Sequence, residues 1–364
     1  MPRPKRYTRT VIFRIPSLPL IALAALCAPA AHYQHHILTR GLGYFPVAIG
    51  LKNGDVLAVL RGGAAHVGVK GRLDLIRSTD RGKTWSAPWT AVDEQFDDRN
   101  PAMGQLRDGT IVLAYVITSG YDETGLRFKD GRTERVFDGV YLIYSKDNGR
   151  TWSKPVRDAG IHKFYAGKGA VSPYGKIIQL PDGTVLMAVY FEFFDDRGNQ
   201  SYLFRSGDGG KTWGEPVLLG AHYNETGIAR LRDGRLLAAM RSEKGGHIAI
   251  TESADQGRTW SSPIQVTGDN EHPADLIQLR DGRVLMVFGE RNAPRGVHAI
   301  ISPDGRKWDN SKAIVLADDA PNVDCGYPSS VETATGQVVT LYYQVDDAKN
   351  APASASARAI LWKP

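Results

Sequence analysis

The sequence predicts an all-β protein, a six-bladed β-propeller with four-stranded antiparallel blades. Two repeated features support this prediction. Six apolar runs each reach a two-residue turn and then restart, at Asn53-Gly54, Asp108-Gly109, Asp182-Gly183, Asp233-Gly234, Asp281-Gly282 and Thr335-Gly336. A Ser-x-Asp-x-Gly-x-Thr-Trp element, or a shorter relative of it, follows at 78–85, 145–152, 206–213, 253–260 and 302–308. A repeat of roughly 50 residues without helical periodicity is typical of radial or solenoid architecture.

Each repeat is expected to contain four short strands. In the fourth repeat, residues 225–231 and 236–240 flank an Asp-Gly turn, which is a strong short-range hairpin signal. Residues 247–251 supply a third strand that runs into the Asp-containing element, and residues 264–266 supply a fourth. Two hairpins in succession therefore build one antiparallel blade.

The Asp-containing element is predicted to be structural rather than catalytic. An Asp side chain accepts backbone N–H groups in a tight turn, Gly occupies a position with positive φ, and Trp packs between neighbouring blades. The regular recurrence of these aspartates, which we call the Asp-box turns, is thus explained by folding.

The sixth repeat ends at 359–362 without an Asp-box turn and lacks a fourth strand. Because a ring of blades must close to remove its free edges, residues 36–39 are predicted to supply the missing outer strand. The repeat extends from about residue 36 to the end of the chain, which indicates a single domain at 31–364.

The first 30 residues differ from the remainder. Five Lys or Arg residues precede an apolar stretch at 18–26, and small residues follow at 28–30, which is typical of a secretory signal peptide and too short for a membrane span. Without this segment the chain holds 40 Lys and Arg against 39 Asp and Glu, so its charge gives no evidence for a nucleic-acid partner. We expect an exported monomer, periplasmic or secreted, without an integral membrane span.

The segments just before the predicted inner strands are the candidates for chemistry, because propellers bind ligands on that face. Five of the six carry ionisable or hydroxyl groups beyond what turns need. They are residues 44–46, 97–101, 172–174, 222–225, 271–275 and 324–328. This pattern predicts a functional pocket around the central axis.

At these segments the chain resembles the sialidase superfamily, over the whole mature length. Asn224-Glu225 looks like the family's Asn-Glu, whose Glu hydrogen-bonds a tyrosine nucleophile, and Tyr327 in Gly326-Tyr327 matches that tyrosine. Arg295 sits where the family places one arginine of a carboxylate-binding triad. The resemblance implies Tyr327 as nucleophile and Glu225 as its base, since a phenol with a pKa of about 10 is a weak nucleophile until a base takes its proton.

Three positions depart from the family pattern. Tyr44-Phe45-Pro46 stands where sialidases carry Arg-Ile-Pro, and in the loop at 61–72, where the acid Asp is expected, the evident proton-transfer group is His66. A second triad arginine is expected just before 248–250, where Arg241 is the nearby candidate. We therefore consider His66 or Asp98 as the acid, and Arg61 and Arg99 as further contacts to an anion or as braces for loop carboxylates.

His66, His222 and His272 are predicted to converge on the axis, as acid, base or substrate-binding groups, or else to bond loop backbone. Metal ligation by three histidines has the right residue type but no local spacing signature, so neither a metal nor a cofactor is expected. Cys325, the one cysteine of the mature chain, is expected to be a small packing residue.

Three functions remain open on the sequence. The first is an exo-glycosidase of sialidase type that removes a terminal acidic sugar, sialic acid or a related keto acid, from a glycan or acidic oligosaccharide. The second is a polysaccharide lyase on uronic acids, in which His222, His272 or Tyr327 abstracts a proton. The third is a glycan-binding propeller without catalysis.

Overall fold

The computed structural model describes residues 1–2, 33–41, 43–129, 136–165, 169–193, 195–346 and 355–364. Two units are separated, Met1–His32 and Tyr33–Pro364, and the second contains all the strands described below. The predicted signal peptide lies outside the described residues except for its first two. In the described part of the chain, no helix has the length and apolar character needed to cross a membrane.

The fold is all-β, and its strands form antiparallel sets of four in chain order. The first two sets are β2 (Tyr44–Gly50), β3 (Val56–Gly62), β4 (Arg72–Ser78) and β5 (Trp89–Val92), and then β6 (Asp97–Gln105), β7 (Ile111–Ser119), β8 (Val136–Ser145) and β9 (Val156–Arg157). The third and fourth sets are β10 (Gly169–Gln179), β11 (Val185–Phe193), β12 (Asn199–Ser206) and β13 (Gly214–Ala221), and then β14 (Tyr223–Arg230), β15 (Leu236–Ser242), β16 (Ile248–Ser253) and β17 (Ile264–Gln265). The fifth set is β18 (Glu271–Gln278), β19 (Val284–Glu290), β20 (Arg295–Ser302) and β21 (Ile314–Ala320), and the last set is β22 (Cys325–Glu332), β23 (Val338–Val345), β24 (Ala355–Trp362) and the N-terminal strand β1 (Gln34–Ile37). The helix α1 (Ala159–Tyr165) and the 3-10 turn η2 (Asn310–Lys312) lie between strands.

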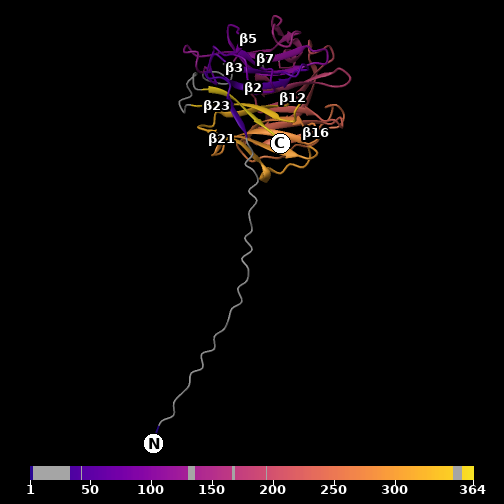
Figure 1. Cartoon of the computed structure of the whole chain (residues 1–364). Coiled ribbons are helices and arrows are strands. Elements are labelled where there is room, and N and C mark those ends of the chain that lie inside the picture. Colours follow the sequence, from indigo (N-terminus) through magenta and orange to yellow (C-terminus); the bar gives the residue numbers. More distant parts are fainter. Residues whose placement is uncertain (3–32, 42, 130–135, 166–168, 194, 347–354) are drawn as a thin grey trace. The chain divides into compact units, whose positions relative to one another are not determined.

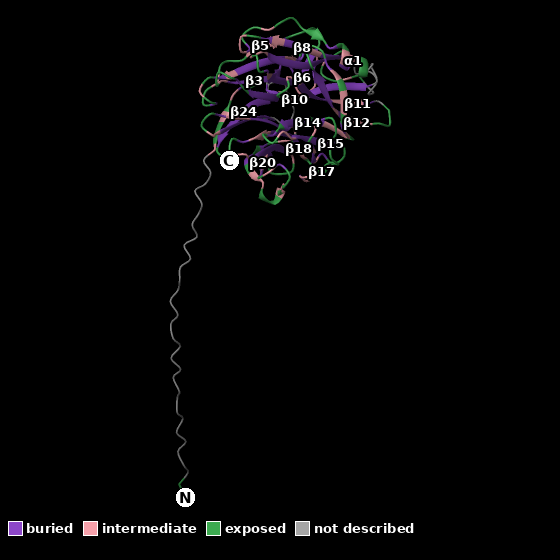
Figure 2. Ribbon diagram, turned by 90° about the vertical axis from the view of Figure 1, so that its right-hand side faces the viewer, coloured by how far each residue is buried: buried purple, intermediate pink, exposed green. Residues whose placement is uncertain are grey.

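The first strands of the sets follow one another through the buried centre, as Figure 2 shows for β6, β10, β14 and β18. A short parallel pairing between β6 and β10 joins the second and third sets into one eight-stranded sheet. The first and last sets are also in contact, since the amide of Ala48 in β2 donates to the Ser329 hydroxyl in β22 at 2.9 Å. Figure 1 shows β23 lying beside β2 and β3. This order is compatible with the predicted propeller.

The apolar core lies between neighbouring sets of strands. One buried cluster joins Val47 and Leu57 of the first set to Leu113 of the second. Another joins Val56 of the first set to Val339 of the last. Each set is therefore covered on both faces, which explains why its central strands are apolar with little alternation.

The N-terminal strand β1 pairs with β24, as predicted for the missing outer strand. Gln34 lies opposite Leu361 and Ile37 opposite Arg358 in an antiparallel register. The strand begins two residues earlier than expected and ends at Ile37, after which the Leu38 amide still donates to the Ala357 carbonyl at 2.8 Å. The last set thereby reaches four strands and its edge is covered.

The Asp-box turns have the structural role that the sequence predicts. In the first, the Gly82 amide donates to the Ser78 hydroxyl at 2.7 Å, while the amide and hydroxyl of Thr84 donate to the Asp80 carboxylate. These bonds from Thr84 lower the pKa of Asp80 to about 2. A Cβ at Gly82 would lie 2.5 Å from the Val339 side chain of the last set, so the turn also fits closely against a neighbouring sheet.

Candidate active site

Irregularities at the start of the first strands turn side chains towards one cavity. The register shifts at the starts of β2, β6 and β22, and in each strand a residue other than glycine has positive φ there: Phe45 (+52°), Asn100 (+50°) and Tyr327 (+51°). Bulges of this kind re-aim side chains, and strained backbone is often found at functional sites. All three residues line the same cavity, together with Glu225.

Tyr327, Glu225 and Arg241 form a hydrogen-bonded group at this cavity. The Tyr327 hydroxyl donates to Oε1 of Glu225 at 2.5 Å, and Nη1 of Arg241 donates to Oε2 of the same carboxylate at 2.7 Å. The guanidinium also lies 3.5 Å from the Tyr327 oxygen. Burial and the charge of Glu225 raise the pKa of Tyr327 far above its ordinary value, so the resting phenol is neutral.

A second arginine, Arg291, lies over the ring of Tyr327. Its guanidinium carbon is 5.6 Å from the ring centroid. Its Nε and Nη2 are buried and have no hydrogen-bond partner in the described ranges, and the same holds for Nε of Arg241 and of Arg295. Buried donors without acceptors are costly, so this surface is suited to an anionic ligand that accepts several hydrogen bonds.

Arg291 is not among the site residues predicted from the sequence, although the strand order carries a signal for it. In each antiparallel set the end of the second strand lies beside the start of the first, as the pairings of Tyr44 with Arg61 and of Glu271 with Glu290 show. Arg291 directly follows β19, so it reaches the same edge. Reading the ends of the second strands as well as the starts of the first strands would have found it.

Arg61 and Arg99 are engaged with the carboxylate of Asp97. Arg61 is fully buried and donates from Nε and Nη2 to Oδ1 of Asp97, at 3.0 and 2.5 Å, while its Nη1 donates to the Ala65 carbonyl. Arg99 donates to Oδ2 of Asp97 at 3.3 Å, and Tyr121 donates to the same atom. These contacts match the bracing role that was one of the two interpretations for these arginines, and they tie the loop after β3 to β6.

His66 stands in that loop and contacts the aromatic side of the cavity. Its Nδ1 lies 2.9 Å from Oδ1 of Asp324, and its ring centroid lies 5.0 Å from that of Phe45. Phe45 in turn packs against Tyr327, with centroids 4.9 Å apart. Phe45 thus forms a wall between His66 and the Tyr327–Glu225 pair. It directly follows Tyr44, the residue that stands where the family has its arginine.

The other predicted site residues are placed differently. Asp98 accepts a hydrogen bond from the Glu94 amide, and as the neighbour of Asp97 in β6 it points to the opposite face of the strand. The His222 side chain is 68% exposed and lies 3.3 Å from Glu243.

His272 is buried near the two arginines of the cavity. Burial, together with the charges of Arg241 and Arg291, lowers its pKa to about 2, so its ring is neutral. No group of three or more His, Cys, Asp or Glu side chains in the described part of the chain is arranged to hold a metal ion. The three histidines therefore do not meet in the metal site considered above.

Cys325 is buried next to the candidate nucleophile. Burial raises the pKa of its thiol to about 11, and the sulfur lies 3.8 Å from the Glu290 carbonyl oxygen. A thiol with a raised pKa is a poor nucleophile. Its surroundings agree with the packing role expected from the sequence.

Comparison with known families assigns this architecture. A model described as a BNR repeat-like domain matches residues 63–340, more than half of the chain. The chain belongs to the BNR repeat-like domain family. Its relatives and structural neighbours are consistent with the sialidase superfamily, as the resemblance had indicated.

This BNR repeat-like protein is similar to sialidases over most of its length. It is 29% identical to a sialidase of Clostridium perfringens over 276 residues, which cover 64% of this chain and 71% of the relative. It is 26% identical to a sialidase of Bacteroides fragilis, over 73% of this chain. The match spans 56% of that second relative's length.

Solved structures show the same fold. A protein of unknown function from Dyadobacter fermentans has a TM-score of 0.76 at 25% identity and covers 92% of this chain and all of its own. A Hadza microbial sialidase, Hz136, has a TM-score of 0.67 at 22% identity, over 87% of this chain and 65% of that structure.

Proposed function

We propose that this protein is an exported sialidase-like exo-glycosidase that hydrolyses a terminal acidic sugar, sialic acid or a related keto acid, from a glycan. The proposal rests on the hydrogen bond from Tyr327 to Glu225. Arg241 and Arg291 lie beside this pair and have buried donors without partners in the described residues. A buried neutral phenol bonded to a carboxylate is the arrangement needed to generate a phenolate only as it attacks. The similarity to sialidases supports the same reading.

In the proposed reaction Tyr327 attacks the anomeric carbon while its proton passes to Glu225. The glycosidic C–O bond breaks, and the leaving oxygen keeps the electron pair and receives a proton. Water then attacks the anomeric carbon and gives its proton to the group that protonated the leaving oxygen. The bond to Tyr327 breaks, and Glu225 returns the proton to the phenolate. A phenol suits this role because an uncharged nucleophile approaches an anionic sugar with less repulsion than a carboxylate.

Arg241, Arg291 and Arg295 are the proposed contacts to the sugar carboxylate. Each has a buried Nε for which the described residues supply no acceptor, and Arg291 has a further free Nη2. A carboxylate would accept these donors and remove their desolvation cost. Arg61 and Arg99 instead stabilise the loop through Asp97.

His66 is the proposed acid, in preference to Asp98. The His66 ring packs against Phe45, which packs against Tyr327. Asp98 instead points to the face of β6 opposite that of Asp97. An imidazole also has an ordinary pKa near neutrality, which suits proton transfer in both directions.

We also propose that the six sets of strands close into a six-bladed propeller and that residues 1–30 direct export. The contact between β2 and β22 and the addition of β1 to the last set support closure. A closed ring would place the starts of all six first strands around one axis, where Tyr327 and Glu225 come from different blades.

Tyr327→Phe tests the function. The mature protein is incubated with sialylated, keto-acid-capped and uronate-containing glycans, and products are analysed by mass spectrometry. We expect a saturated acidic monosaccharide from the wild type and a loss of at least about 10³-fold in the variant. Tyr144→Phe, which removes a hydroxyl that donates to the Gly210 carbonyl, is the matched control and should keep full activity. Full activity of Tyr327→Phe would refute the proposed nucleophile.

A lyase is the second candidate, favoured by one feature. His272 is neutral and lies near Arg241 and Arg291, and its Nδ1 has no hydrogen-bond partner in the described part of the chain. A neutral imidazole with a free nitrogen, next to arginines that would bind a carboxylate, could accept the proton that a lyase removes. An unsaturated sugar in the same experiment would identify elimination. Ligand that binds but returns unchanged after long incubation would instead indicate a glycan-binding protein.

A further inference from the structure

We infer that Asp324 and Tyr343 are positioning residues that hold the His66 ring so that its Nε2 transfers the proton to and from the glycosidic oxygen. The inference rests on the proposed function, because it assigns the geometry of the acid in that reaction. It concerns residues from three separate parts of the chain: the loop after β3, the segment before β22, and β23.

The His66 ring is held on several sides. Asp324 binds its Nδ1 at 2.9 Å, and the rings of Phe45 and Tyr44 pack on it at centroid distances of 5.0 and 5.8 Å. Its backbone carbonyl accepts from Nη2 of Arg99 at 3.3 Å. Arg99, which also donates to Asp97, thus links the backbone at His66 to β6.

Asp324 is itself fixed by independent contacts. Its Oδ1 accepts from the Tyr343 hydroxyl at 2.5 Å, and its backbone amide donates to the Asn322 side chain at 2.8 Å. Burial alone would raise the pKa of this carboxyl, but the hydrogen bonds from His66 and Tyr343 outweigh burial and hold the pKa below its ordinary value. The group is an ionised acceptor that orients a donor.

The orientation decides which ring nitrogen is available. A carboxylate can only accept, so the tautomer that binds Asp324 carries its hydrogen on Nδ1. Nε2 has no hydrogen-bond partner among the residues that the structure describes, and His66 keeps 34% of its side chain exposed. Nε2 is therefore the ring nitrogen left free for proton transfer, and Phe45 packs against the rings of both His66 and Tyr327.

The proton balance follows from this arrangement. Protonated His66 donates from Nε2 to the leaving oxygen as the glycosidic bond breaks and becomes neutral, with its Nδ1 hydrogen still on Asp324. In the second step Nε2 takes a proton from the attacking water, which restores the cation. Asp324 keeps its charge throughout and stabilises the imidazolium, while Tyr343 limits rotation of the carboxylate.

Other charged and titratable groups that face His66 are few. Arg99 of β6 contacts its carbonyl, Tyr44 of β2 packs on its ring, and Asp324 and Tyr343 act as described. Arg291 influences the ring through its charge on Asp324.

The experiment compares two substrates that differ only in their leaving group. An aryl glycoside of the accepted sugar leaves without a proton, whereas a sugar-linked glycoside needs one. We expect Asp324→Asn to lower kcat for the sugar-linked substrate on the order of tenfold to a hundredfold and to change the aryl glycoside less than about threefold. His66→Ala should show the same pattern with a larger loss. Tyr343→Phe should also lower kcat for the sugar-linked substrate more than for the aryl glycoside, but by less than Asp324→Asn does. It provides the test of the inference if Asp324→Asn does not fold.

A second readout does not need activity. In the ¹⁵N NMR spectrum of His-labelled wild type, neutral His66 should show the Nδ1-protonated tautomer, and Asp324→Asn should change the tautomer ratio. Equal losses on both substrates with an unchanged His66 spectrum would overturn the inference. If the wild type hydrolyses no acidic glycoside but the NMR result is as expected, the proposed function fails and the positioning contact stands.

Discussion

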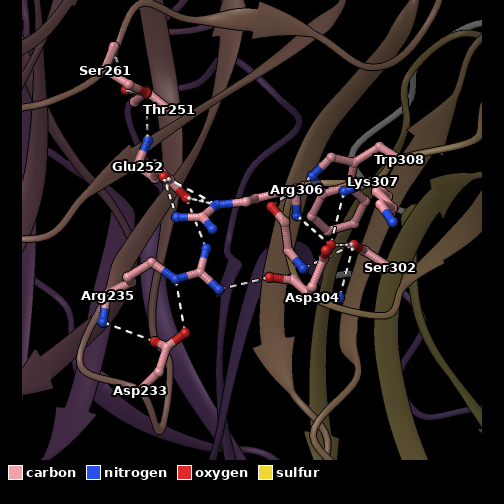
Figure 3. A network of polar contacts seen from close by, with 11 residues as sticks. Asp233, Arg235, Thr251, Glu252, Ser261, Ser302, Asp304, Arg306, Lys307 and Trp308 are labelled. Atoms are coloured by element: carbon pink, nitrogen blue, oxygen red, sulfur yellow. Dashed lines mark hydrogen bonds and ion pairs between the residues drawn. The ribbon is translucent and has the colours of Figure 1, made fainter.

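Arginines and carboxylates meet in two regions of this molecule, and they are paired differently. Between the set β14–β17 and the set β18–β21, Glu252 accepts from Nη1 of Arg235 at 2.8 Å and from Nη2 of Arg306 at 2.8 Å (Figure 3). Arg235 also donates to Asp233 at 2.8 Å and to the Asp304 carbonyl at 2.8 Å. This group, which we call the outer network, satisfies its cations from several neighbours.

The cavity around Tyr327 lacks such balance. Glu225 is engaged by one arginine and one phenol, while Arg241 and Arg291 beside Tyr327 retain buried donors without acceptors in the described residues. Three residues at its rim have positive φ without being glycine. A satisfied network stabilises a fold, whereas unpaired buried donors and strained backbone are costs that persist where they serve a ligand. Arginines and carboxylates therefore stabilise the fold in the outer network, whereas around Tyr327 they leave donors available for a ligand.

The largest expected effect on kcat comes from replacing the carboxylate of each region, Glu225 in the cavity and Glu252 in the outer network. Glu225→Gln removes the base for Tyr327 and should reduce kcat by about 10²–10⁴-fold on the accepted glycoside. Glu252→Gln makes the same change in the outer network and should alter kcat less than about twofold, with a lower melting temperature. Steady-state kinetics and thermal unfolding of both variants test this. Comparable losses of kcat in the two variants would show that Glu225 has no special role.

A matched pair of arginine substitutions gives the next largest effect. Arg291→Met should lower kcat/KM about tenfold to a hundredfold for an acidic sugar, mainly through KM, because a carboxylate contact is lost. Its free energy of unfolding should stay constant or rise, since the variant removes buried unpaired donors. Arg235→Met should leave kcat/KM unchanged and lower the free energy of unfolding by about 1–2 kcal/mol.

Urea unfolding and kinetics on the two arginine variants provide the measurement. The informative result is the opposite sign of the two effects, since both substitutions remove one guanidinium. A loss of stability in Arg291→Met as large as that in Arg235→Met would mean that its guanidinium is as well satisfied in solution as the outer network.

Local patterns were sufficient to predict much of the fold. The Asp-Gly turns and the Asp-box turns mark hairpins through chemistry that acts within four residues, and the contacts of Ser78, Asp80 and Thr84 are of this kind. The outer strand at Gln34–Ile37 was predicted to within two residues, because an uncovered edge needs a partner. Tyr327 and Glu225 came from the family resemblance, and the structure brings them within 2.5 Å.

The missed parts of the site depend on contacts that are distant in the chain. His66 and Asp324 are 258 residues apart, so no local pattern connects them. The sequence also does not show that Arg61 and Arg99 are already neutralised by Asp97, or that Arg291 is not. Whether a charge is available to a ligand is decided by packing, which residue type and order alone do not express.

Asp98 also bears on this comparison, because one oxygen of its buried carboxyl lacks a partner although we place it outside the catalytic machinery. It is fully buried, and its Oδ1 has no partner in the described part of the chain. Burial raises its pKa to about 7, with the nearby charges of Glu94 and Asp97 acting in the same direction. Its ordinary value in an unfolded chain is about 3.9, so between these pH values the folded state binds more protons than the unfolded state.

Stability from this group is therefore greatest below pH of about 4 and declines as the pH rises to about 7. Asp98→Asn removes the ionisation, so its free energy of unfolding relative to the wild type should increase by about 4 kcal/mol between pH 4 and pH 8. Urea unfolding at the two pH values measures the difference, and kcat should stay within about twofold of the wild type, unlike His66→Ala. A loss of kcat specific to the sugar-linked substrate would instead return Asp98 to the role of acid, and its unpartnered Oδ1 would then belong to the catalytic machinery, like the free donors of Arg241 and Arg291.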